Sequence, residues 1–534
     1  MGLRLKGRPP ASSTQTRKFS KTKPLQPTGR RGFFVFVGST LHRALLVETV
    51  TGRTMAELIA ARDAVTRADM IELRLDGVGD LDVAEALEGR TLPAIITCRP
   101  AWEGGRFDGA EEERRSILSD ALDRGADYVD VEWRAGFADL IARDPRRIVL
   151  SSHDFQRVPE DLAARATAMR QAGAGTVKIA VAAAGLSDAL VLQPIAAEGD
   201  AVVIAMGDAG LPSRLLASRF GSRWTYAGEV IAPGQIPAAR MLDEFRFRDI
   251  GPSTAIYGVV GNNVMHSLSP AMHNAAFRAA GLDAVYVPLP AADFSDLMAF
   301  AEAMHIEGVS VTIPFKLDAL RAAAQVDSLT RAVGAANTLR WSARGLLATN
   351  TDVDGFLEPL TRTYPGALDG VRVAVLGAGG AARAVTIALL SRGAQVTIHA
   401  RRHDQAADVA AGCGATVGGW PPPAGSWDLL VNCTPLGGAT ARNASPLPDG
   451  PLTGRMVYDL TYGQAETPLL RDARKAGCLT LDGLPMLVAQ AERQFEWWTG
   501  VRPPEGVMTA AARMRGAVHA HGPRRHEGTE IFHV

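Results

Sequence analysis

The sequence is poor in several features that mark large classes of proteins. Its four cysteines are far apart and lack metal-ligand spacing, so we expect neither a disulfide framework nor a metal site. Lysine plus arginine and aspartate plus glutamate both number 57, which leaves no net charge to attract nucleic acid or a membrane surface. No segment approaches 18 consecutive apolar residues, and no signal peptide is recognisable. These absences predict a cytoplasmic protein whose partners are small molecules.

The length and composition predict an α/β protein of several domains. A chain of 534 residues is too long for one hydrophobic core, and 47% hydrophobic with 21% charged residues is typical of a folded protein. The first 31 residues contain nine Lys/Arg and no Asp/Glu, a composition that cannot form a core. We therefore predict a disordered basic leader over residues 1–38, with organelle targeting as the alternative interpretation.

The first half contains eight short apolar runs that alternate with helical segments between residues 43 and 230. Eight strands with crossover helices in about 200 residues predict a (β/α)₈ TIM barrel. Seven polar residues fall in the later part of these runs, where a barrel builds its sites. They are Glu72, Arg74, Arg99, Asp130, Glu132, His153 and Lys178.

Lys178 stands in an apolar run, GTVKIAVAA, that predicts a strand buried on both faces. Burial lowers the pKa of a lysine, and a neutral lysine is a nucleophile that forms imines with ketones. His153, one strand earlier, has the side chain best suited to move a proton near neutral pH. Arg74, Arg99 and Arg214 have the forked donors that bind a carboxylate. This half therefore predicts Schiff-base chemistry on an anionic ketone.

The second half contains a nucleotide-binding pattern. The segment VRVAVLGAGGAARAVTIALLSRGAQVTIHARR, residues 371–402, reads as strand, glycine turn, helix and second strand, which is the context of a Rossmann dinucleotide site. The helix N-terminus would receive the pyrophosphate. Arg401 and Arg402 stand where an NAD-binding protein has an acidic residue, so NADP is the expected cofactor.

Other segments of the second half carry polar residues beside apolar strands. VMHSLSPAMHN places Ser267 and Ser269 on one side of what we expect to be an extended segment. SVTIPFK and NTDVDG supply Lys316 and Asp352, an amine and a carboxylate that suit proton transfer beside a hydride acceptor.

A charged segment followed by Gly-Pro near residues 245–255 marks a domain boundary. We predict a barrel over residues 39–247, a substrate domain over 253–350 and 486–515, a Rossmann domain over 351–485, and a tail over 516–534.

The first half resembles type I 3-dehydroquinate dehydratase from about Leu45 to Gln235. The resemblance rests on ELRLD, TCRPAWEGG, DVE, SSHDF, VKIA, MGDAGLPSR and APGQI. It implies that Lys178 forms an imine with the C3 ketone of 3-dehydroquinate, that His153 removes the C2 proton, and that Glu132 partners His153. The substrate-binding residues that it implies are Glu72, Arg74, Arg99, Arg214 and Gln235. Ile231 stands where the family has a serine, which removes one hydroxyl contact.

Residues 256–510 resemble shikimate dehydrogenase, through the segments above and NCTPLGG, YDLTY and DGLPMLVAQAERQFEWWTG. The resemblance implies that Lys316 and Asp352 transfer the proton. It also implies substrate contacts by Ser267, Ser269, Thr312, Asn337, Tyr462 and Gln490. The implied NADPH contacts are Gly377, Ala378, Gly379, Gly380, Ala382, Arg401, Arg402, Thr434 and Gly483. One departure is Ser310, where an asparagine is common.

Together the halves resemble the fused enzyme that converts 3-dehydroquinate to 3-dehydroshikimate and then to shikimate. Three alternatives stay open on the sequence. The barrel can belong to another Schiff-base enzyme such as a class I aldolase, the reductase can prefer quinate, or the chain can be a metabolite sensor without turnover. The presence of Lys178, His153, Lys316 and Asp352 argues against the sensor.

Overall fold

The computed structural model describes residues 43–228, 233–262, 264–438, 441–448, 450, 452–463 and 465–521. The leader, Ile231 and the last 13 residues lie outside the described residues. Among the described residues, no helix is long and apolar enough to cross a membrane.

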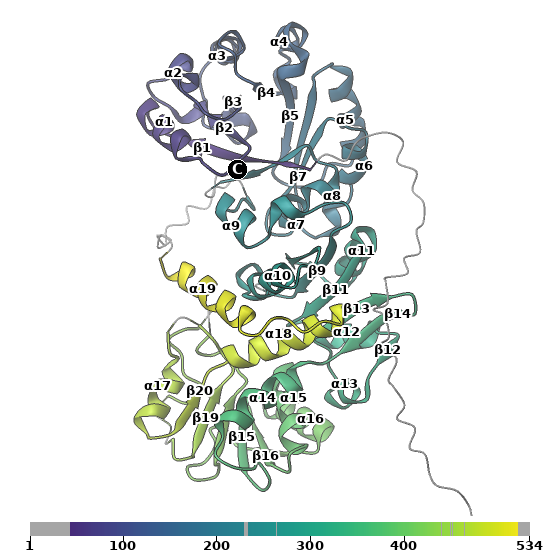
Figure 1. The fold of residues 1–534 in the computed structure, drawn as a ribbon, viewed down its shortest axis with the longest axis vertical. Helices are drawn as coiled ribbons and strands as arrows, with labels where there is room; N and C mark the ends of the chain where they lie inside the picture. Colours follow the sequence, from purple (N-terminus) through teal and green to yellow (C-terminus); the bar gives the residue numbers. More distant parts are fainter. Residues whose placement is uncertain are drawn as a thin grey trace, which may run out of the picture. The chain divides into compact units, whose positions relative to one another are not determined.

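Eight parallel strands form the barrel predicted for the first half (Figure 1). They pair in the order β7-β6-β5-β4-β3-β2-β1-β8, and the backbone N–H of Arg223 joins the two ends by donating to Ala201 O at 2.9 Å. The strands are β1 (Leu45–Thr51), β2 (Met70–Arg74), β3 (Ala94–Thr97), β4 (Tyr128–Glu132), β5 (Ile148–Asp154), β6 (Thr176–Ala182), β7 (Ala201–Met206) and β8 (Trp224–Ala227).

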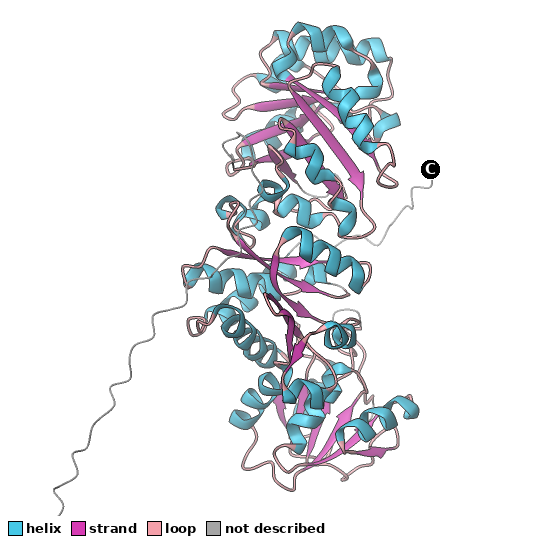
Figure 2. Cartoon of the chain, turned by 90° about the vertical axis from the view of Figure 1, so that its right-hand side faces the viewer, coloured by secondary structure: helices cyan, strands magenta, loops and turns pink. Residues whose placement is uncertain are grey.

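Helices cover the outside of these strands (Figure 2). They are α1 (Met55–Ala64), α2 (Val83–Leu87), α3 (Glu111–Asp123), α4 (Ala138–Arg143), α5 (Leu162–Gln171), α6 (Leu192–Ala197), α7 (Leu211–Leu215), α8 (Ala217–Phe220) and α9 (Ala238–Asp243). Because helices bury one face of each strand and the barrel interior buries the other, the strands read as continuous apolar runs. All six residues of β7 are buried.

The barrel interior is apolar toward the beginnings of the strands and charged toward their ends. Its apolar cluster includes Val47, Met70, Ile95, Val149 and Val202. Side chains alternate between the two faces of a strand, so the residues two positions after these also point inward. Those positions hold Thr49, Glu72, Thr97, Ser151 and Ile204, four of them polar. The carboxyl ends of the strands therefore meet in a polar site, as in other barrels of this kind.

The second half contains two six-stranded sheets. The first has the order β10-β9-β11-β13-β14-β12, and the second has the order β17-β16-β15-β18-β19-β20 with all strands parallel. The first consists of β9 (Ala255–Val260), β10 (Ala284–Leu289), β11 (Ile306–Val311), β12 (Gln325–Val326), β13 (Thr338–Ser342) and β14 (Gly345–Thr349). The second consists of β15 (Arg372–Leu376), β16 (Gln395–His399), β17 (Thr416–Gly418), β18 (Leu429–Asn432), β19 (Met456–Asp459) and β20 (Leu479–Leu481).

Helices connect the strands of this half, and one late in the chain returns to the first sheet. They are α10 (Ser269–Ala279), α11 (Phe294–Met304), α12 (Lys316–Ala322), α13 (Ser328–Val333), α14 (Asp352–Thr363), α15 (Gly380–Leu390), α16 (His403–Cys413), α17 (Pro468–Lys475), α18 (Leu484–Thr499) and α19 (Val507–His521). Trp498 in α18 donates from Nε1 to Leu339 O in β13 at 2.9 Å. A Cβ on Gly355 of α14 would lie 2.7 Å from Gln490 Cβ, so the glycine lets α14 and α18 approach closely.

Candidate active sites

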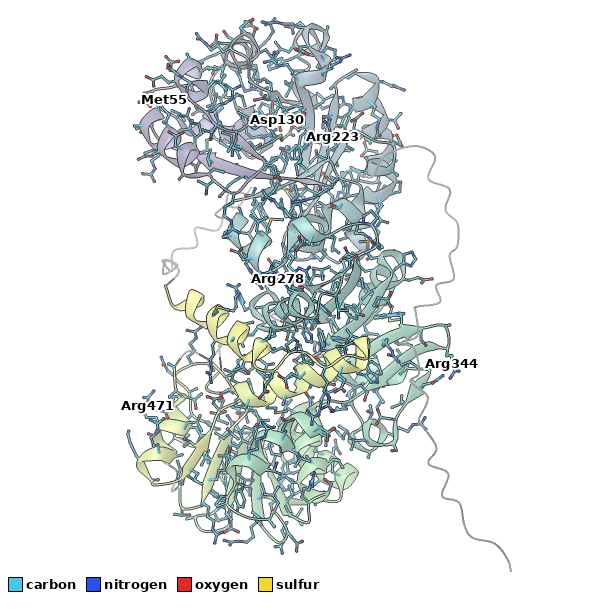
Figure 3. The ribbon with its side chains drawn as sticks, viewed as in Figure 1. Met55, Asp130, Arg223, Arg278, Arg344 and Arg471 are labelled. Carbon is cyan, nitrogen blue, oxygen red and sulfur yellow. The ribbon has the colours of Figure 1, made fainter. Side chains whose placement is uncertain are left out.

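Lys178 projects from β6 into the polar end of the barrel, where it is 4% exposed. Its Nζ lies 2.9 Å from Asp130 Oδ2, 3.5 Å from Glu72 Oε1 and 4.3 Å from the centre of the Tyr226 ring. Figure 3 shows Asp130 in the interior of the barrel. The lysine predicted as the nucleophile is thus enclosed by two carboxylates and an aromatic face.

These neighbours overturn the expectation of a neutral amine. Burial by itself lowers the pKa of Lys178, because an ammonium is poorly solvated inside a protein. Attraction to Asp130, Tyr226 and Glu72 outweighs burial, so the pKa of Lys178 stands above its usual value. The sequence predicted the burial of Lys178 but not the carboxylates beside it. The side chain is therefore an ammonium ion at neutral pH.

His153 lies on the strand next to Lys178 and on the same face. Ser151 is the neighbour of Lys178 across β5 and β6, and His153 is the neighbour of Ala180. Two residues along a strand span about 7 Å, so His153 lies one inward position nearer the barrel mouth. The ring of Phe155 stacks beside it, with the ring centres 6.0 Å apart.

The partner of His153 is Glu103 and not the predicted Glu132. His153 Nδ1 lies 2.9 Å from Glu103 Oε1, and the backbone N–H of His153 donates to the same oxygen at 3.0 Å. Glu132 lies between two guanidinium groups, at 2.6 Å from Arg99 and in contact with Arg114. A buried carboxylate is stabilised most by the nearest cations, and for Glu132 these are the arginines.

Burial shifts the pKa values of both Glu103 and His153. Burial raises the pKa of Glu103 to about 7, although Arg99 opposes the shift. Burial also lowers the pKa of His153 well below its usual value, and the nearby cations Arg99 and Lys178 lower it further. His153 is therefore a neutral imidazole near pH 7. In the tautomer in which Nδ1 donates to Glu103, Nε2 is the ring nitrogen that is free to accept a proton.

Two of the three predicted carboxylate-binding arginines are already paired. Arg74 holds Asp76 with both arms of its fork, at 2.8 and 2.9 Å. Arg99 holds Asp130 at 3.0 Å and donates to Ser151 Oγ at 2.8 Å, in addition to its pair with Glu132. These arginines hold the carboxylates of the site in place, and their role as substrate ligands stays a prediction.

Arg214 is different, because it is 2% exposed and has no carboxylate beside it among the described residues. Its NH2 group donates to Pro233 O at 3.1 Å, and its buried Nε has no hydrogen-bond partner in the part of the chain that the structure describes. Burial lowers the pKa of Arg214 to about 10. A buried cation with a free donor is suited to an anionic ligand, since such a ligand would compensate the lost hydration.

The remaining predicted residues of the barrel, Glu72 and Gln235, belong to a hydrogen-bonded group that also includes Thr49 and Thr97. Thr49 and Thr97 donate to the two carboxylate oxygens of Glu72 at 2.9 Å each. Gln235 lies 3.4 Å from Thr49 through Nε2. The group holds Glu72 rigidly beside Lys178.

The second site is built around Lys316 and Asp352. Lys316 Nζ lies 2.6 Å from Asp352 Oδ2, and the side chains come from the first residues of α12 and α14. Asn337 Nδ2 donates to Asp352 Oδ1 at 2.8 Å and lies 3.4 Å from Gln490 Oε1. Four residues predicted from distant segments are thus in contact, with both oxygens of Asp352 occupied.

Ser267 and Ser269 do not lie on an extended segment as predicted. They follow a 3₁₀ turn over Val264–His266 and stand at the start of α10, where Ser267 Oγ accepts from the backbone N–H of Ser269 at 3.1 Å. The residue that caps α10 is Leu268, whose side chain makes no capping hydrogen bond, and the Ser267 hydroxyl satisfies the N–H of the first helical residue instead. Thr312 directly follows β11. Tyr462 is 37% exposed, and the described residues include no hydrogen bond between it and either serine.

The glycine turn fits a dinucleotide. Gly377 has φ 105°, which a larger residue rarely adopts, and a Cβ there would lie 3.2 Å from Thr434 Cγ2. A Cβ on Gly379 would meet nothing within 4 Å, so the space before α15 is open. Lys316 Cδ lies 3.2 Å from the place of a Cβ on Gly380. The glycine turn and the Lys316–Asp352 pair therefore belong to one site.

The other residues predicted to contact the cofactor surround this turn. Arg401 and Arg402 follow β16 and are exposed, and neither guanidinium has a hydrogen bond or ion pair within the described part of the chain. Two unpaired guanidinium groups fit a 2′-phosphate. Thr434 Oγ1 donates to Asn432 Oδ1 at 2.7 Å. Ala378 lies in the turn, Ala382 is buried in α15, and Gly483 precedes α18, where a Cβ would lie 2.1 Å from Leu460 O.

Comparison with known proteins supports both halves. Family profiles match residues 47–252 as type I 3-dehydroquinase, 259–339 as shikimate dehydrogenase substrate binding domain, and 483–513 as shikimate 5′-dehydrogenase C-terminal domain. The bifunctional 3-dehydroquinate dehydratase/shikimate dehydrogenase, chloroplastic, of Arabidopsis thaliana is 34% identical over 476 residues, which are 82% of this chain and 79% of that protein. The chain belongs to this bifunctional family.

Other relatives match one half of the chain. The shikimate dehydrogenase (NADP(+)) of Methanocella arvoryzae is 41% identical over 267 residues, covering 48% of this chain and 98% of that protein. The crystal structure of shikimate 5-dehydrogenase from Thermus thermophilus in complex with NADP(H) and shikimate is 35% identical and covers 49% of this chain and 99% of that chain, with a TM-score of 0.44.

Sequence reasoning about the bifunctional chain missed Glu103 as the partner of His153. Glu103 stands within TCRPAWEGG, the segment that carries the resemblance, but it follows β3 in a 3₁₀ turn over Ala101–Glu103. No strand periodicity points a side chain in such a turn toward a particular neighbour. The signal available was an acidic residue in the turn that follows a polar strand end, together with a histidine that needs an acceptor.

Proposed function

We propose that this chain is a bifunctional enzyme that dehydrates 3-dehydroquinate to 3-dehydroshikimate and then reduces that product to shikimate with NADPH. The observation that carries the proposal is that a chain of the bifunctional family contains both proposed pairs of catalytic residues. Lys178 with His153 occupies the barrel, and Lys316 with Asp352 adjoins the glycine turn. Each pair does a different kind of chemistry.

In the barrel, we infer that Lys178 bonds covalently to the C3 ketone. The ammonium would first give a proton to the Asp130 carboxylate, 2.9 Å away, so that the free amine can attack C3. The resulting carbinolamine would take that proton back as its hydroxyl group leaves as water, and a protonated imine remains. Asp130 and Glu72, which stabilise the ammonium, would stabilise the protonated imine equally. The raised pKa of Lys178 makes its first deprotonation harder, whereas the same two carboxylates favour the cationic imine that withdraws electrons from C2.

The neutral imidazole of His153 would remove the proton from C2, and the electron pair of that bond would move toward the imine nitrogen. The hydroxyl group on C1 then leaves and takes a proton from His153, which forms water and the C1–C2 double bond. Hydrolysis of the imine returns the ammonium of Lys178 and releases 3-dehydroshikimate. Glu103 would hold Nδ1, so that Nε2 faces the substrate, and Arg214 would bind the carboxylate.

In the second site, bound NADPH supplies the hydride. Lys316 would hold and donate the proton that the reduced oxygen takes, and Asp352 would orient the ammonium through its 2.6 Å contact. Asn337, Gln490 and Thr312 would bind ring hydroxyls, with Ser267, Ser269 and Tyr462 at the carboxylate. Gly377, Gly379 and the start of α15 would receive the pyrophosphate, and Arg401 with Arg402 the 2′-phosphate.

A coupled assay tests the proposal on the whole chain. 3-Dehydroquinate and NADPH are supplied together, and both the absorbance of the enone and the oxidation of NADPH are followed. We expect one equivalent of NADPH to be oxidised per 3-dehydroquinate consumed. Formation of the enone without oxidation of NADPH would support the dehydratase activity and refute the reductase activity.

Initial rates with shikimate and with quinate, each with NADP⁺, decide between these two acids as substrates. A faster oxidation of quinate at equal concentration would assign the second site to quinate. We also propose a cytoplasmic location from the scattered cysteines and the composition. A fusion of residues 1–38 to a fluorescent protein tests the alternative, since organelle import of the fusion would contradict it.

A further inference from the structure

Three buried polar side chains lie beneath the second site and have no place in the chemistry above. Tyr286 comes from β10, Ser310 from β11 and Gln494 from α18. Tyr286 Oη lies 2.6 Å from Ser310 Oγ, and Ser310 Oγ lies 2.7 Å from Gln494 Oε1. All three are buried, at 0%, 7% and 1% exposed, so each hydrogen bond is made away from water.

The direction of this chain of hydrogen bonds is fixed at the Gln494 end. Gln494 Nε2 lies 3.3 Å from the carbonyl oxygen of Asn337 and 2.9 Å from Thr338 Oγ1. A carbonyl oxygen only accepts, so the NH₂ group of Gln494 faces it, and Oε1 faces Ser310. Ser310 has one proton and donates it to Oε1. The proton between Tyr286 and Ser310 therefore belongs to Tyr286.

Both ends of the chain reach proposed substrate ligands. At one end, Thr338 Oγ1 donates to Asn337 Oδ1 at 2.7 Å, while Asn337 Nδ2 donates to Asp352. At the other end, the Tyr286 hydroxyl adjoins Ser269. Burial raises the pKa of Tyr286, and its hydrogen bonds with Ser310 and Ser269 oppose that rise. The chain thus links the proposed carboxylate end of the substrate to the proposed hydroxyl end.

We propose that Tyr286, Ser310 and Gln494 are positioning residues that fix Asn337 and Ser269 for the acid substrate. The inference rests on the proposed function of this site. Asn337 and Ser269 are each held by a donor or acceptor whose own orientation is set by the next residue in the hydrogen-bonded series. Neither side chain therefore has to become ordered when the substrate binds. Loss of one member should weaken binding of the acid without affecting NADP⁺, whose proposed contacts lie on the other sheet.

Tyr257 provides a matched control for Tyr286. The two tyrosines are direct neighbours across β9 and β10, and both rings are buried in the same apolar cluster. The described residues offer the Tyr257 hydroxyl no hydrogen-bond partner. Tyr286→Phe and Tyr257→Phe therefore remove the same atom from two neighbouring rings of one cluster, one within the hydrogen-bonded series Tyr286–Ser310–Gln494 and one outside it.

The test measures initial rates of shikimate oxidation by the full-length protein, with the concentrations of shikimate and of NADP⁺ each varied. We expect Tyr286→Phe to raise the KM for shikimate about 3- to 10-fold, the factor that one net hydrogen bond is worth, and to leave the KM for NADP⁺ unchanged. Tyr257→Phe should change neither constant. Equal effects of the two variants, or an equal rise of both KM values in Tyr286→Phe, would overturn the proposal.

Substitutions of Ser310 test the middle of the hydrogen-bonded series Tyr286–Ser310–Gln494. Ser310→Ala should raise the KM for shikimate, and Ser310→Thr, which keeps the hydroxyl group, should recover most of the wild-type value. Alanine and threonine variants with the same KM would refute a role for the hydroxyl group. In a double-mutant cycle, Tyr286→Phe with Gln494→Leu should raise KM by less than the product of the two single effects, because either change breaks the same chain.

The proposed function and this inference fail in different ways. Wild-type protein that does not oxidise shikimate refutes the function itself. If the wild type is active and the Tyr286→Phe and Tyr257→Phe variants have the same KM for shikimate, the proposed function stands and only the positioning role is refuted.

Discussion

Lys178 and Lys316 have the same side chain in two different surroundings. Lys178 is enclosed by Asp130, Glu72 and Tyr226, whereas Lys316 has one carboxylate partner, Asp352, and adjoins an open glycine turn. The first ammonium is buried in a strand of the barrel, and the second stands at the start of a helix with its side chain 15% exposed.

The difference shows how the surroundings of one functional group select its chemistry. A protonated imine carries a positive charge at nitrogen, so fixed carboxylates on two sides stabilise that intermediate. A proton donor at an alcohol oxygen has to reach a substrate that enters and leaves, which suits a partly exposed lysine with a single orienting carboxylate. The predictions below test this contrast.

The largest expected effect is that of Lys178→Ala on the dehydratase. Removal of a covalent nucleophile should lower kcat by on the order of 10⁴-fold, while NADP⁺-dependent shikimate oxidation stays at the wild-type value. Beyond residue 42 the chain has three lysines, Lys178, Lys316 and Lys475. Borohydride reduction with 3-dehydroquinate should therefore attach mass to the peptide that carries Lys178 and to neither of the other two. Mass on Lys316 would reverse the assignment.

Asp352→Asn should lower the shikimate dehydrogenase activity and leave the dehydratase activity unchanged, the opposite pattern to Lys178→Ala. The amide cannot hold the ammonium of Lys316 by charge, so we expect shikimate oxidation to fall by about 10²- to 10⁴-fold, the usual contribution of general acid–base catalysis. The rate of 3-dehydroquinate dehydration should not change. Asp354 lies two residues further along α14 and is exposed, so Asp354→Asn is the matched control and should retain both activities. A large loss in the control would point to damage of the helix.

Substitution of both Arg401 and Arg402 by alanine should change the cofactor preference. Loss of charge-assisted hydrogen bonds to a 2′-phosphate should raise the KM for NADP⁺ by about 10- to 100-fold and leave the KM for NAD⁺ nearly unchanged. Arg471→Ala, an exposed arginine on α17 in the same half, should affect neither cofactor. Parallel changes for NADP⁺ and NAD⁺ would show that the pair does not read the 2′-phosphate.

Glu103→Gln should have the smallest effect at neutral pH and a distinctive pH dependence. The pKa of Glu103 is raised by burial from 4.5 to about 7 in the folded protein, so its ionisation opposes folding. This penalty enters as the pH rises through that interval, because the unfolded chain loses the proton first. Glutamine is neutral at every pH and avoids the penalty.

Thermal unfolding should therefore show Glu103→Gln gaining stability relative to wild type between about pH 5 and pH 8. The rate of dehydration should fall by about 10-fold, because the amide orients His153 less firmly than a carboxylate. Glu160→Gln, at an exposed position of the barrel, is the control and should show neither change. A stability difference that does not vary with pH would contradict the shifted pKa of Glu103.

The fold was predictable because it depends on local patterns. Each barrel strand is an apolar run with helices on one side and the barrel interior on the other, so burial on both faces is written in the composition of the run. The glycine turn of residues 377–380 was likewise predictable, since positive φ at Gly377 and the open space before α15 need residues without a side chain.

The contacts inside the sites were predictable only in part. Lys316 and Asp352 were named from separate segments, and they meet at 2.6 Å. Glu132 was assigned to His153 by the family resemblance, and strand position by itself does not tell which of several carboxylates a histidine meets. Glu103 takes that place from a turn. The segment of Ser267 and Ser269 was expected to be extended, but it holds a 3₁₀ turn and the start of α10, and its short polar sequence does not tell these conformations apart.

The sequence by itself determined which groups are present, how the chain divides into apolar strands and helices, and that Lys178 stands in a buried strand. Only the tertiary structure decided the charge and partners of these groups. Periodicity reports which way a side chain leaves its own element, whereas a pKa depends on charges within a few ångströms from any element. For Lys178 those charges come from β2 and β4, and their distances to Nζ exist only once the barrel has formed.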